Sequence, residues 1–360
     1  MYQSSGGAHD KVVGCFVQAG EVDKIIPYAK EHSYQPDWAQ LLQQMVHTHP
    51  EKSSEFAQTL AKNSPGPLIQ IDTAVDIFMQ FKRLPECTSF LYEVLSEDRK
   101  EQGYLQTRLL EMNMLGGAAP VADAILGSQT FHHFDKKHIA TLAERCGLYH
   151  RALELHEDVE DMKRVIPNVA RDPKHRPFLI KFFSTLVSDD ALACVTALLD
   201  TKQVDEAVVE IAKQYSDFMG PEKLIQMFED RKSTNALYYY LAGIVNTSES
   251  PEVHFKYIQV AAELNQPDEV LRVCRDSNVY NPEDVKDYLI GKKLPNPQPL
   301  IWVCDRHGFV PELTHYLHTN KLQRFLEVYV LKVSPKSCPQ VIGKLLDLDA
   351  DEKFVMNLIS

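Results

Sequence analysis

The sequence predicts an all-α protein, a right-handed α-solenoid (superhelix) of stacked antiparallel helical hairpins. Apolar residues recur at the spacing of one helix face in almost every window, and short turn signals separate these segments. In addition, no segment of comparable length alternates between apolar and polar residues with period two, as a half-buried strand would. The chain therefore needs no sheet to bury its apolar side chains.

The apolar residues of each expected helix recur at i, i+3, i+4 and i+7, which places them on one helix face. Clear examples lie at residues 38–46, 71–79, 87–95 and 204–212. Because 44% of the 360 residues are hydrophobic, such faces can together bury a large core. We expect helices of roughly 10 to 16 residues, a length typical of helical repeats.

Helix starts are indicated where a residue with a side-chain oxygen precedes proline, because the oxygen satisfies one exposed amide and proline lacks another. Ser250-Pro251 and Asn281-Pro282 show this pattern, and Gly220-Pro221 is a weaker example. Asp135 can cap the following helix without a proline. Helix breaks are expected where glycine or proline residues gather, at 65–67, 116–117 and 294–299.

Tight turns of one kind recur along the chain. A residue that adopts a left-handed conformation readily is followed by apolar residues five and eight positions later. The four examples are Gly20 with Ile25 and Tyr28, Gly147 with Ala152 and Leu155, Asn265 with Val270 and Val273, and Gly308 with Leu313 and Tyr316. A helical hairpin cannot bury its flanks alone, so hairpins should stack side by side. The spacing of these turns is irregular, and no strict short repeat is predicted.

The charge balance disfavours two classes of partner. Asp and Glu total 50 against 38 Lys and Arg, which gives a formal net charge of −12 and repels nucleic acid and anionic membrane surfaces. No apolar run approaches the roughly 20 residues that cross a bilayer, and the N-terminus does not resemble a secretion signal. Residues 1–7 are expected to form a frayed or added end.

The cysteines favour a reducing compartment. They are odd in number, far apart and without a CxxC pair, and several fall on apolar helix faces, as expected for free buried thiols. The seven are Cys15, Cys87, Cys146, Cys194, Cys274, Cys304 and Cys338.

Histidine supplies the one cluster that could hold a metal, at residues 132–138. It lacks the ligand spacing of zinc sites, so a polar loop leading into a capped helix is the favoured interpretation. His47 and His49 are interpreted as the polar end of a helix before Pro50. No GxSxG, P-loop or GxGxxG pattern occurs. We predict no catalytic, cofactor-binding or metal-binding residues and no enzyme activity, and the sequence assigns no protein-binding residues.

Two other groups of residues fit structural roles. Acidic pairs such as Asp189-Asp190 and Glu206 with Glu210 suit solvated helix faces and first turns. The aromatic runs 238–240 and 182–183 point in several directions on a helix, so at least one ring in each should pack on a neighbouring hairpin.

Several stretches resemble the clathrin heavy-chain family. Residues 104–131, YLQTRLLEMNMLGGAAPVADAILGSQTF, contain an LQTRLLEMN run followed by VADAILG, as that family does. Residues 253–289 resemble its HFKYIQ helix and the following turn, and residues 300–310 and 339–349 match in the same order. Gly116-Gly117-Ala118-Ala119, residues 172–180 and residues 248–252 depart from the family pattern.

The resemblance implies a place in the family's leg, from the ankle into the start of the distal leg. It implies clathrin heavy-chain repeat units at residues 8–171 and 172–319, with a third beginning at 320–360. It further implies a structural role in the coat lattice of endocytosis and intracellular vesicle-mediated protein transport, on the cytosolic face of coated pits and vesicles. Expected partners are other heavy-chain legs, whereas light chains and adaptors bind parts of the family outside this sequence. No nucleic acid, cofactor or membrane insertion is expected.

Two alternatives stay open on the sequence. A protein-docking solenoid of a vacuolar or lysosomal tethering complex would share the repeat, but it would lack the LQTRLLEMN and HFKYIQ motifs. An enzyme within a helical array would need a convergent polar pocket with perturbed ionisable groups.

Overall fold

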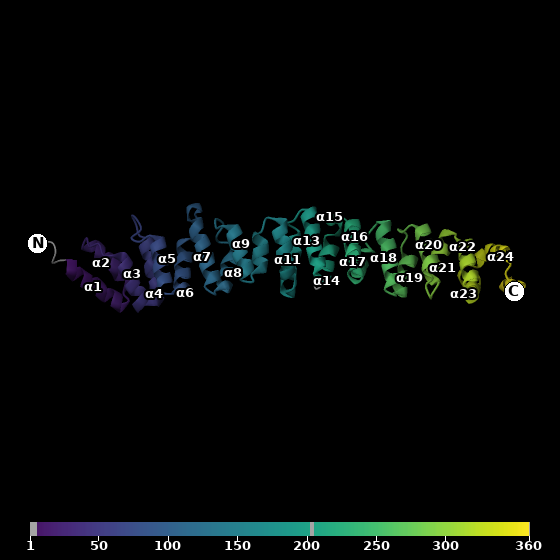
Figure 1. Cartoon of the computed structure of the whole chain (residues 1–360), viewed down its shortest axis with the longest axis horizontal. Coiled ribbons are helices and arrows are strands. Elements are labelled where there is room, and N and C mark those ends of the chain that lie inside the picture. Colours follow the sequence, from purple (N-terminus) through teal and green to yellow (C-terminus); the bar gives the residue numbers. More distant parts are fainter. Residues whose placement is uncertain (1–5, 202–204, 360) are drawn as a thin grey trace. The chain divides into compact units, whose positions relative to one another are not determined.

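The computed structural model describes residues 6–201 and 205–359 of the chain. Every regular element in these two ranges is helical, which confirms the predicted all-α solenoid class (Figure 1). Of the predicted end 1–7, residues 1–5 lie outside the described ranges, and Gly6 and Gly7 begin the first helix. Val204, the first apolar residue of one expected helix, also lies outside them.

The helices group into two compact units, which divide the chain between Val169 and Ala170. The first unit contains the helices α1 (Gly6–Ala19), α2 (Val22–Glu31), α3 (Trp38–Thr48), α4 (Pro50–Ala61), α5 (Ile71–Gln80), α6 (Leu84–Val94), η1 (Lys100–Gln102), α7 (Gly103–Leu115), α8 (Ala119–Ser128), α9 (Lys136–Arg145), α10 (Tyr149–Leu155) and α11 (Val159–Ala170), the last of which ends at the division.

The second unit continues the same architecture to the end of the described residues. Its elements are η2 (Pro173–His175), α12 (Arg176–Phe183), α13 (Ser188–Asp200), α14 (Asp205–Gln214), α15 (Ser216–Met219), α16 (Pro221–Asp230), α17 (Thr234–Ile244), α18 (Pro251–Glu263), α19 (Pro267–Asp276), α20 (Pro282–Lys292), α21 (Gln298–His307), α22 (Val310–Thr319), α23 (Gln323–Val328), η3 (Tyr329–Val333), η4 (Pro335–Ser337), α24 (Cys338–Asp347) and α25 (Glu352–Ile359). The repeat boundaries inferred above stay a prediction.

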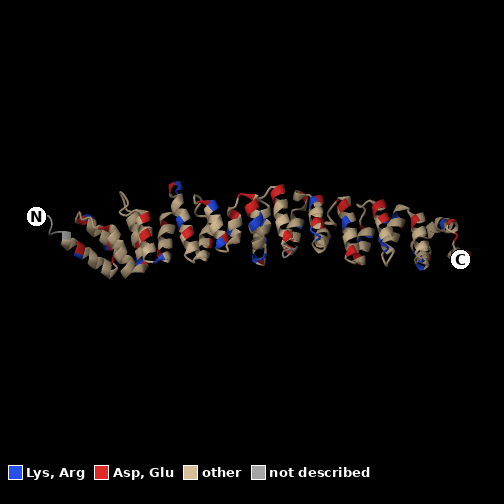
Figure 2. Cartoon of the chain, viewed as in Figure 1, with Lys and Arg blue, Asp and Glu red and all other residues tan. Residues whose placement is uncertain are grey.

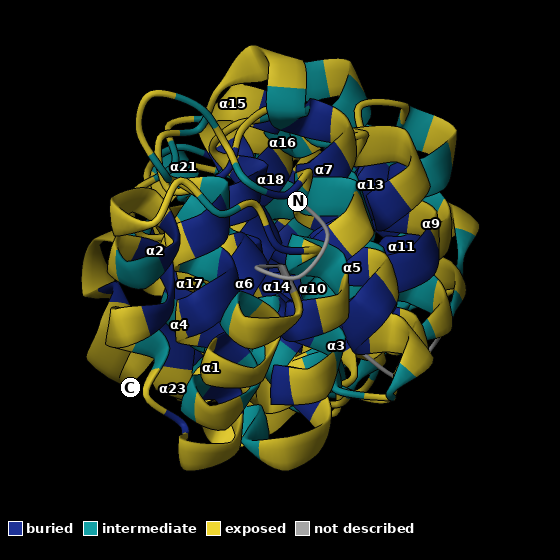
Figure 3. Cartoon of the chain, turned by 90° about the vertical axis from the view of Figure 1, so that its left-hand side faces the viewer, coloured by how far each residue is buried: buried dark blue, intermediate teal, exposed yellow. Residues whose placement is uncertain are grey.

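Within each unit, helices pack on the next helix and on the next but one. In the first unit α6 contacts α4, α5 and α7, and in the second unit α18 contacts α16, α17, α19 and α20. This pattern is that of hairpins stacked in two layers. Within the helices, buried residues alternate with exposed residues, so that each helix has a buried face and an exposed face (Figure 3).

The hairpin turns were predicted correctly at all four positions. Their turn residues, Gly20, Gly147, Asn265 and Gly308, have φ between 55° and 79°. In each case the next residue donates its N–H to the carbonyl five residues back, at 2.8–2.9 Å. This is the hydrogen bond of the Schellman motif, which satisfies a carbonyl left free at a helix end.

Among the further turns of this kind, three have lysine in the left-handed position and for that reason were not predicted. Lys82, Lys232 and Lys321 have φ of 56°, 55° and 58°, and the same hydrogen bond closes each turn at 2.8–3.0 Å. The residues five and eight positions later are again buried: Cys87 and Phe90, Leu237 and Tyr240, and Leu326 and Tyr329. The burial pattern, more than the turn residue itself, identifies these hairpins.

The predicted helix starts are also present, with one difference in their chemistry. Asp135 accepts a hydrogen bond from the His138 amide, and Asn281 accepts one from the Glu283 amide. Ser250 precedes α18 as expected, but its hydroxyl donates to the Glu252 carboxylate and does not cap the backbone. Several helices are shorter than expected, down to the four residues of α15, because turns interrupt the apolar stripes.

The aromatic runs pack as predicted. Tyr240 is fully buried and stacks on Phe228 at 5.5 Å, and Tyr238 stacks on Tyr257 of the next helix at 5.5 Å. Tyr239, between them, is exposed. In the run 182–183, Phe183 is buried and stacks on Tyr215.

Gly147 offers a clean test of the left-handed turns. Its φ is +79°, and a Cβ added there would meet no atom within 4 Å, so a substitution would act through backbone conformation alone. We expect Gly147→Val to lower the free energy of unfolding by more than about 1 kcal/mol, since a β-branched side chain disfavours positive φ. Gly147→Asn should have a mild effect. Equal melting temperatures of the two variants would contradict this turn geometry.

Candidate interaction surfaces

Polar residues of α7 connect this helix to its neighbours, and Gln106 is at the centre. Its side chain is fully buried. The Gln106 Nε2 donates to the Asp98 carboxylate at 2.7 Å, and its Oε1 accepts from the His133 backbone N–H at 2.9 Å. One amide group thus joins the loop before α7 to the loop before α9. A buried amide with both ends paired favours a single arrangement of these segments.

Asp98 is the second member of this junction. It accepts hydrogen bonds from the backbone N–H and the Nδ1 of His132, at 3.1 and 2.8 Å. Burial by itself would raise the pKa of Asp98, but the bonds from His132 and Gln106 outweigh it and lower the pKa below its usual value. The lowered pKa means that the carboxylate stabilises the fold at neutral pH. This contribution is fully present above the usual pKa of an aspartate and is lost as the pH falls through the lowered pKa.

The histidine cluster takes part in this junction as a polar loop. His132 contacts Asp98, and His138 Nε2 lies 3.4 Å from the Glu111 carboxylate, on another helix. Among the described residues no group of three histidine, cysteine, aspartate or glutamate side chains is arranged to hold a metal ion. His49 occupies the bend between α3 and α4, and its Nε2 lies 2.9 Å from the Gln18 carbonyl, as expected for a polar helix end.

The other polar residues of the LQTRLLEMN run reach other neighbours. Thr107 Oγ1 accepts from the Asp135 N–H at 2.9 Å, and Arg108 forms ion pairs with two aspartates of α5. Asn113 is buried and accepts from the Thr88 hydroxyl of α6 at 3.0 Å. The run therefore combines core leucines with polar side chains that each bond a different segment. The sequence alone did not reveal this role, because the partners are far away along the chain.

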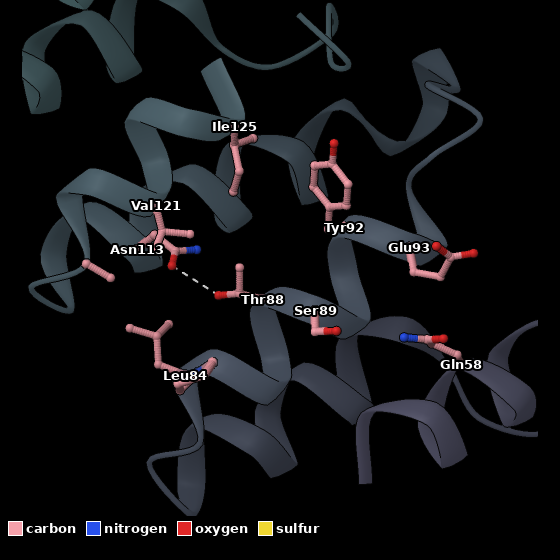
Figure 4. Close-up of a pocket in the computed structure, with 11 residues that line it drawn as sticks. Gln58, Leu84, Thr88, Ser89, Tyr92, Glu93, Asn113, Val121 and Ile125 are labelled. Atoms are coloured by element: carbon pink, nitrogen blue, oxygen red, sulfur yellow. Dashed lines mark hydrogen bonds between the residues drawn. The ribbon is translucent and has the colours of Figure 1, made fainter. Parts of the chain in front are cut away.

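Beside Asn113 lies an apolar groove of about 490 Å³ between α6 and α8. Leu84 contributes one side and Val121 and Ile125 the other, with the Thr88–Asn113 hydrogen bond between them (Figure 4). Its one carboxylate, Glu93, forms an ion pair with Lys62 at 2.7 Å. The lining suits apolar contact with another molecule. Acid–base chemistry would need several ionisable groups that converge on one point, and this lining offers only one carboxylate, Glu93.

A smaller, polar hollow of about 310 Å³ in the second unit surrounds His254. The His254 side chain is buried, with Nε2 2.9 Å from the Ser248 carbonyl and Nδ1 2.9 Å from the Ser277 hydroxyl. The Ser248 carbonyl can only accept a hydrogen bond, so Nε2 donates to it, whereas the Ser277 hydroxyl can serve Nδ1 as donor or acceptor. Since both ring nitrogens are engaged, His254 holds the loops after α17 and α19 together.

The remaining reactive side chains are placed in the core or on solvated faces. Burial raises the pKa of Cys87, Cys274 and Cys304 to about 12, which keeps these thiols protonated and unreactive. Asp189 and Asp190 lie in the first turn of α13, as predicted. In the described parts of the chain, no helix has the length and apolar character needed to span a membrane.

Comparisons with known proteins place these features in one family. The family described as a region in clathrin and VPS matches residues 63–206 and 212–353. The clathrin heavy chains of Drosophila melanogaster and Dictyostelium discoideum are each 45% identical to this chain, over 97% and 98% of its length. Human clathrin heavy chain 2 is 44% identical over 97% of the chain. The matched region is 21% of the length of each of these relatives.

Proposed function

This chain belongs to the clathrin family, and we propose that it acts as a structural leg segment of a clathrin heavy chain in the coat lattice of transport vesicles. The observation that supports this most is the extent of the similarity. Identity of 44–45% extends over nearly the whole chain, and the described residues form stacked hairpins throughout. A protein that acts through its shape needs such continuity, whereas an enzyme needs a local site.

The fold suits the mechanics of a coat. Each hairpin contacts only its near neighbours, so a small change at each interface adds up to bending along a solenoid. One strut can then adapt to lattices of different curvature while every interface stays near its own minimum. Individual contacts between legs are expected to be weak and polar, and the lattice gains strength because each leg makes many of them.

The proposed partners are other heavy-chain legs, at the cytosolic face of coated pits and vesicles during endocytosis and intracellular protein transport. Light chains and adaptors would bind heavy-chain regions outside this sequence, and the segment would have no enzymatic role of its own. A docking module of a tethering complex is less favoured, because the relatives described above are clathrin heavy chains. We also propose that the segment lies at the ankle and the start of the distal leg.

If this segment is a passive strut, it should not form dimers when it is isolated from the rest of the leg. The segment carries a net charge of −12, which opposes close approach of two copies at low salt. An isolated segment also loses the effective-concentration advantage of a whole leg. We expect a monomer at micromolar concentration, no cages under acidic assembly conditions and poor competition with intact triskelia. Sedimentation velocity over a concentration series tests this. A dimer of micromolar or tighter affinity would contradict the passive-strut proposal and would indicate a dedicated docking module.

A further inference from the structure

Near the end of the chain, apolar side chains that face solvent line a second groove, here called the α21–α23 groove. It has a volume of about 470 Å³ and is lined by Gln298, Ile301, Trp302, Arg324, Phe325, Val328, Tyr329 and Val333. Trp302, Val328 and Val333 are 41–46% exposed, and the adjacent Leu331 is 60% exposed. Large apolar residues gathered in this way on a surface mark contact with another molecule.

The groove owes its shape to a π-helical turn at Tyr329–Val333. The N–H of Ser334 donates to the Tyr329 carbonyl at 2.8 Å, five residues back. The wider turn brings Val333 into the groove together with Val328, five positions earlier. Tyr329 is buried beneath it, and its hydroxyl donates to Asp305 of α21 at 2.9 Å. Such π-turns are frequent at functional sites.

The segment that contributes α23 and the π-turn to this groove is basic, although the chain as a whole is acidic. Residues 321–344 contain five basic residues, Lys321, Arg324, Lys332, Lys336 and Lys344, and one acidic residue, Glu327. Arg324 lines the groove, and Lys332 lies in the π-turn. In the described part of the chain no ion pair joins any of the five to a carboxylate. Elsewhere, Lys and Arg are interspersed with Asp and Glu (Figure 2).

We propose that the α21–α23 groove binds a short, acidic, amphipathic helix of a partner protein. Two or three apolar side chains of that helix would enter the groove, and its carboxylates would meet Arg324 and Lys332. The volume lies in the range of ligand-binding sites. Because the groove is bordered by helices, it offers no strand edge to an extended peptide. A helical ligand satisfies its own backbone groups and lays one apolar face between α21 and α23. A concave site also fits a helix better than it fits a flat bilayer.

Binding of a defined probe to the whole chain tests the proposal. The probe is a fluorescent helical peptide with leucine at i, i+4 and i+7 and glutamate at the other positions. Two comparison peptides replace its leucines by glutamine or its glutamates by lysine. Fluorescence anisotropy should show saturable binding of the acidic amphipathic peptide, weakened by salt, and at least about tenfold weaker binding of both comparison peptides.

Two variants locate the binding site. Arg324→Glu should weaken binding about tenfold or more, whereas Lys223→Glu, an equal charge change on exposed α16, should leave it unchanged. Arg324 is exposed and has no ion pair, so its variant should keep the melting temperature of the parent. Val328→Gln, on the apolar wall, should also weaken binding. The proposal is overturned if both charge variants bind equally, if the leucine-free peptide binds as well, or if the groove instead binds phosphatidylserine vesicles or a second copy of the chain.

Discussion

Replacing Gly103 by alanine should destabilise the first unit by about 3 kcal/mol, a cost at the upper end of overpacking. A Cβ built on Gly103 would lie 2.3 Å from the His133 carbonyl oxygen and 3.2 Å from its carbonyl carbon. The first of these separations is far below any contact that a real Cβ makes. The clashing atom belongs to the backbone of His133, so it cannot move aside as a flexible side chain could. Helix α7 or the loop before α9 must therefore move, and the Gln106 hydrogen bonds at the same junction would be strained.

Amide hydrogen exchange, read separately for peptides of each unit, measures this effect. Gly103→Ala should speed exchange in residues 98–113 and 130–140 and leave the second unit unchanged. Gly14→Ala, within α1, is the matched control, because its Cβ would meet nothing within 4 Å. Alanine there should be neutral or stabilising by about 0.5–1 kcal/mol. An unchanged exchange pattern in Gly103→Ala would show that the two segments are not in contact.

Gln106→Met should cost about 2 kcal/mol, although methionine fills a similar volume. The variant keeps the apolar packing of α7 but removes a donor to Asp98 and the acceptor of the His133 N–H. An unpaired buried polar group costs roughly 1–3 kcal/mol. Urea unfolding followed by circular dichroism gives the free energy, and hydrogen exchange should show the His133 amide opening first.

Gln40→Met, on the exposed face of α3, is the control for this change. It should alter stability by less than about 0.5 kcal/mol, as surface substitutions do. If both methionine variants are equally stable, the buried amide contributes packing alone and the junction does not depend on its hydrogen bonds.

Local chemistry explains which parts of the fold the sequence could predict. Gly147 and Asn281 act within a few residues of themselves, as a left-handed turn and a helix cap, so their roles are visible in the sequence. The turn at Lys232 could not be predicted, because lysine has no preference for the left-handed conformation. The feature that it shares with the predicted turns is a buried residue eight positions later, Tyr240. The π-turn at 329–333 has no comparable local signal.

The contacts of Gly103 and Gln106 and the two grooves could not be predicted from the sequence, for a different reason. Gly103 resembles an ordinary loop glycine until His133 is placed against it, 30 positions away along the chain. Gln106 looks like a helix-surface residue until its two partners are known. Both grooves depend on how helices stack, so their outlines follow from packing and cannot be derived from any one helix.

The most direct test of the coat role is assembly of a heavy chain that contains this segment. We would replace the matching 21% of the Drosophila clathrin heavy chain by these residues and purify the resulting triskelia. Sedimentation should first show intact trimers. Pelleting and electron microscopy at assembly pH should then show closed cages in yield similar to the parent heavy chain. Intact, helical triskelia that form no cages would contradict the proposal that this segment is a lattice strut.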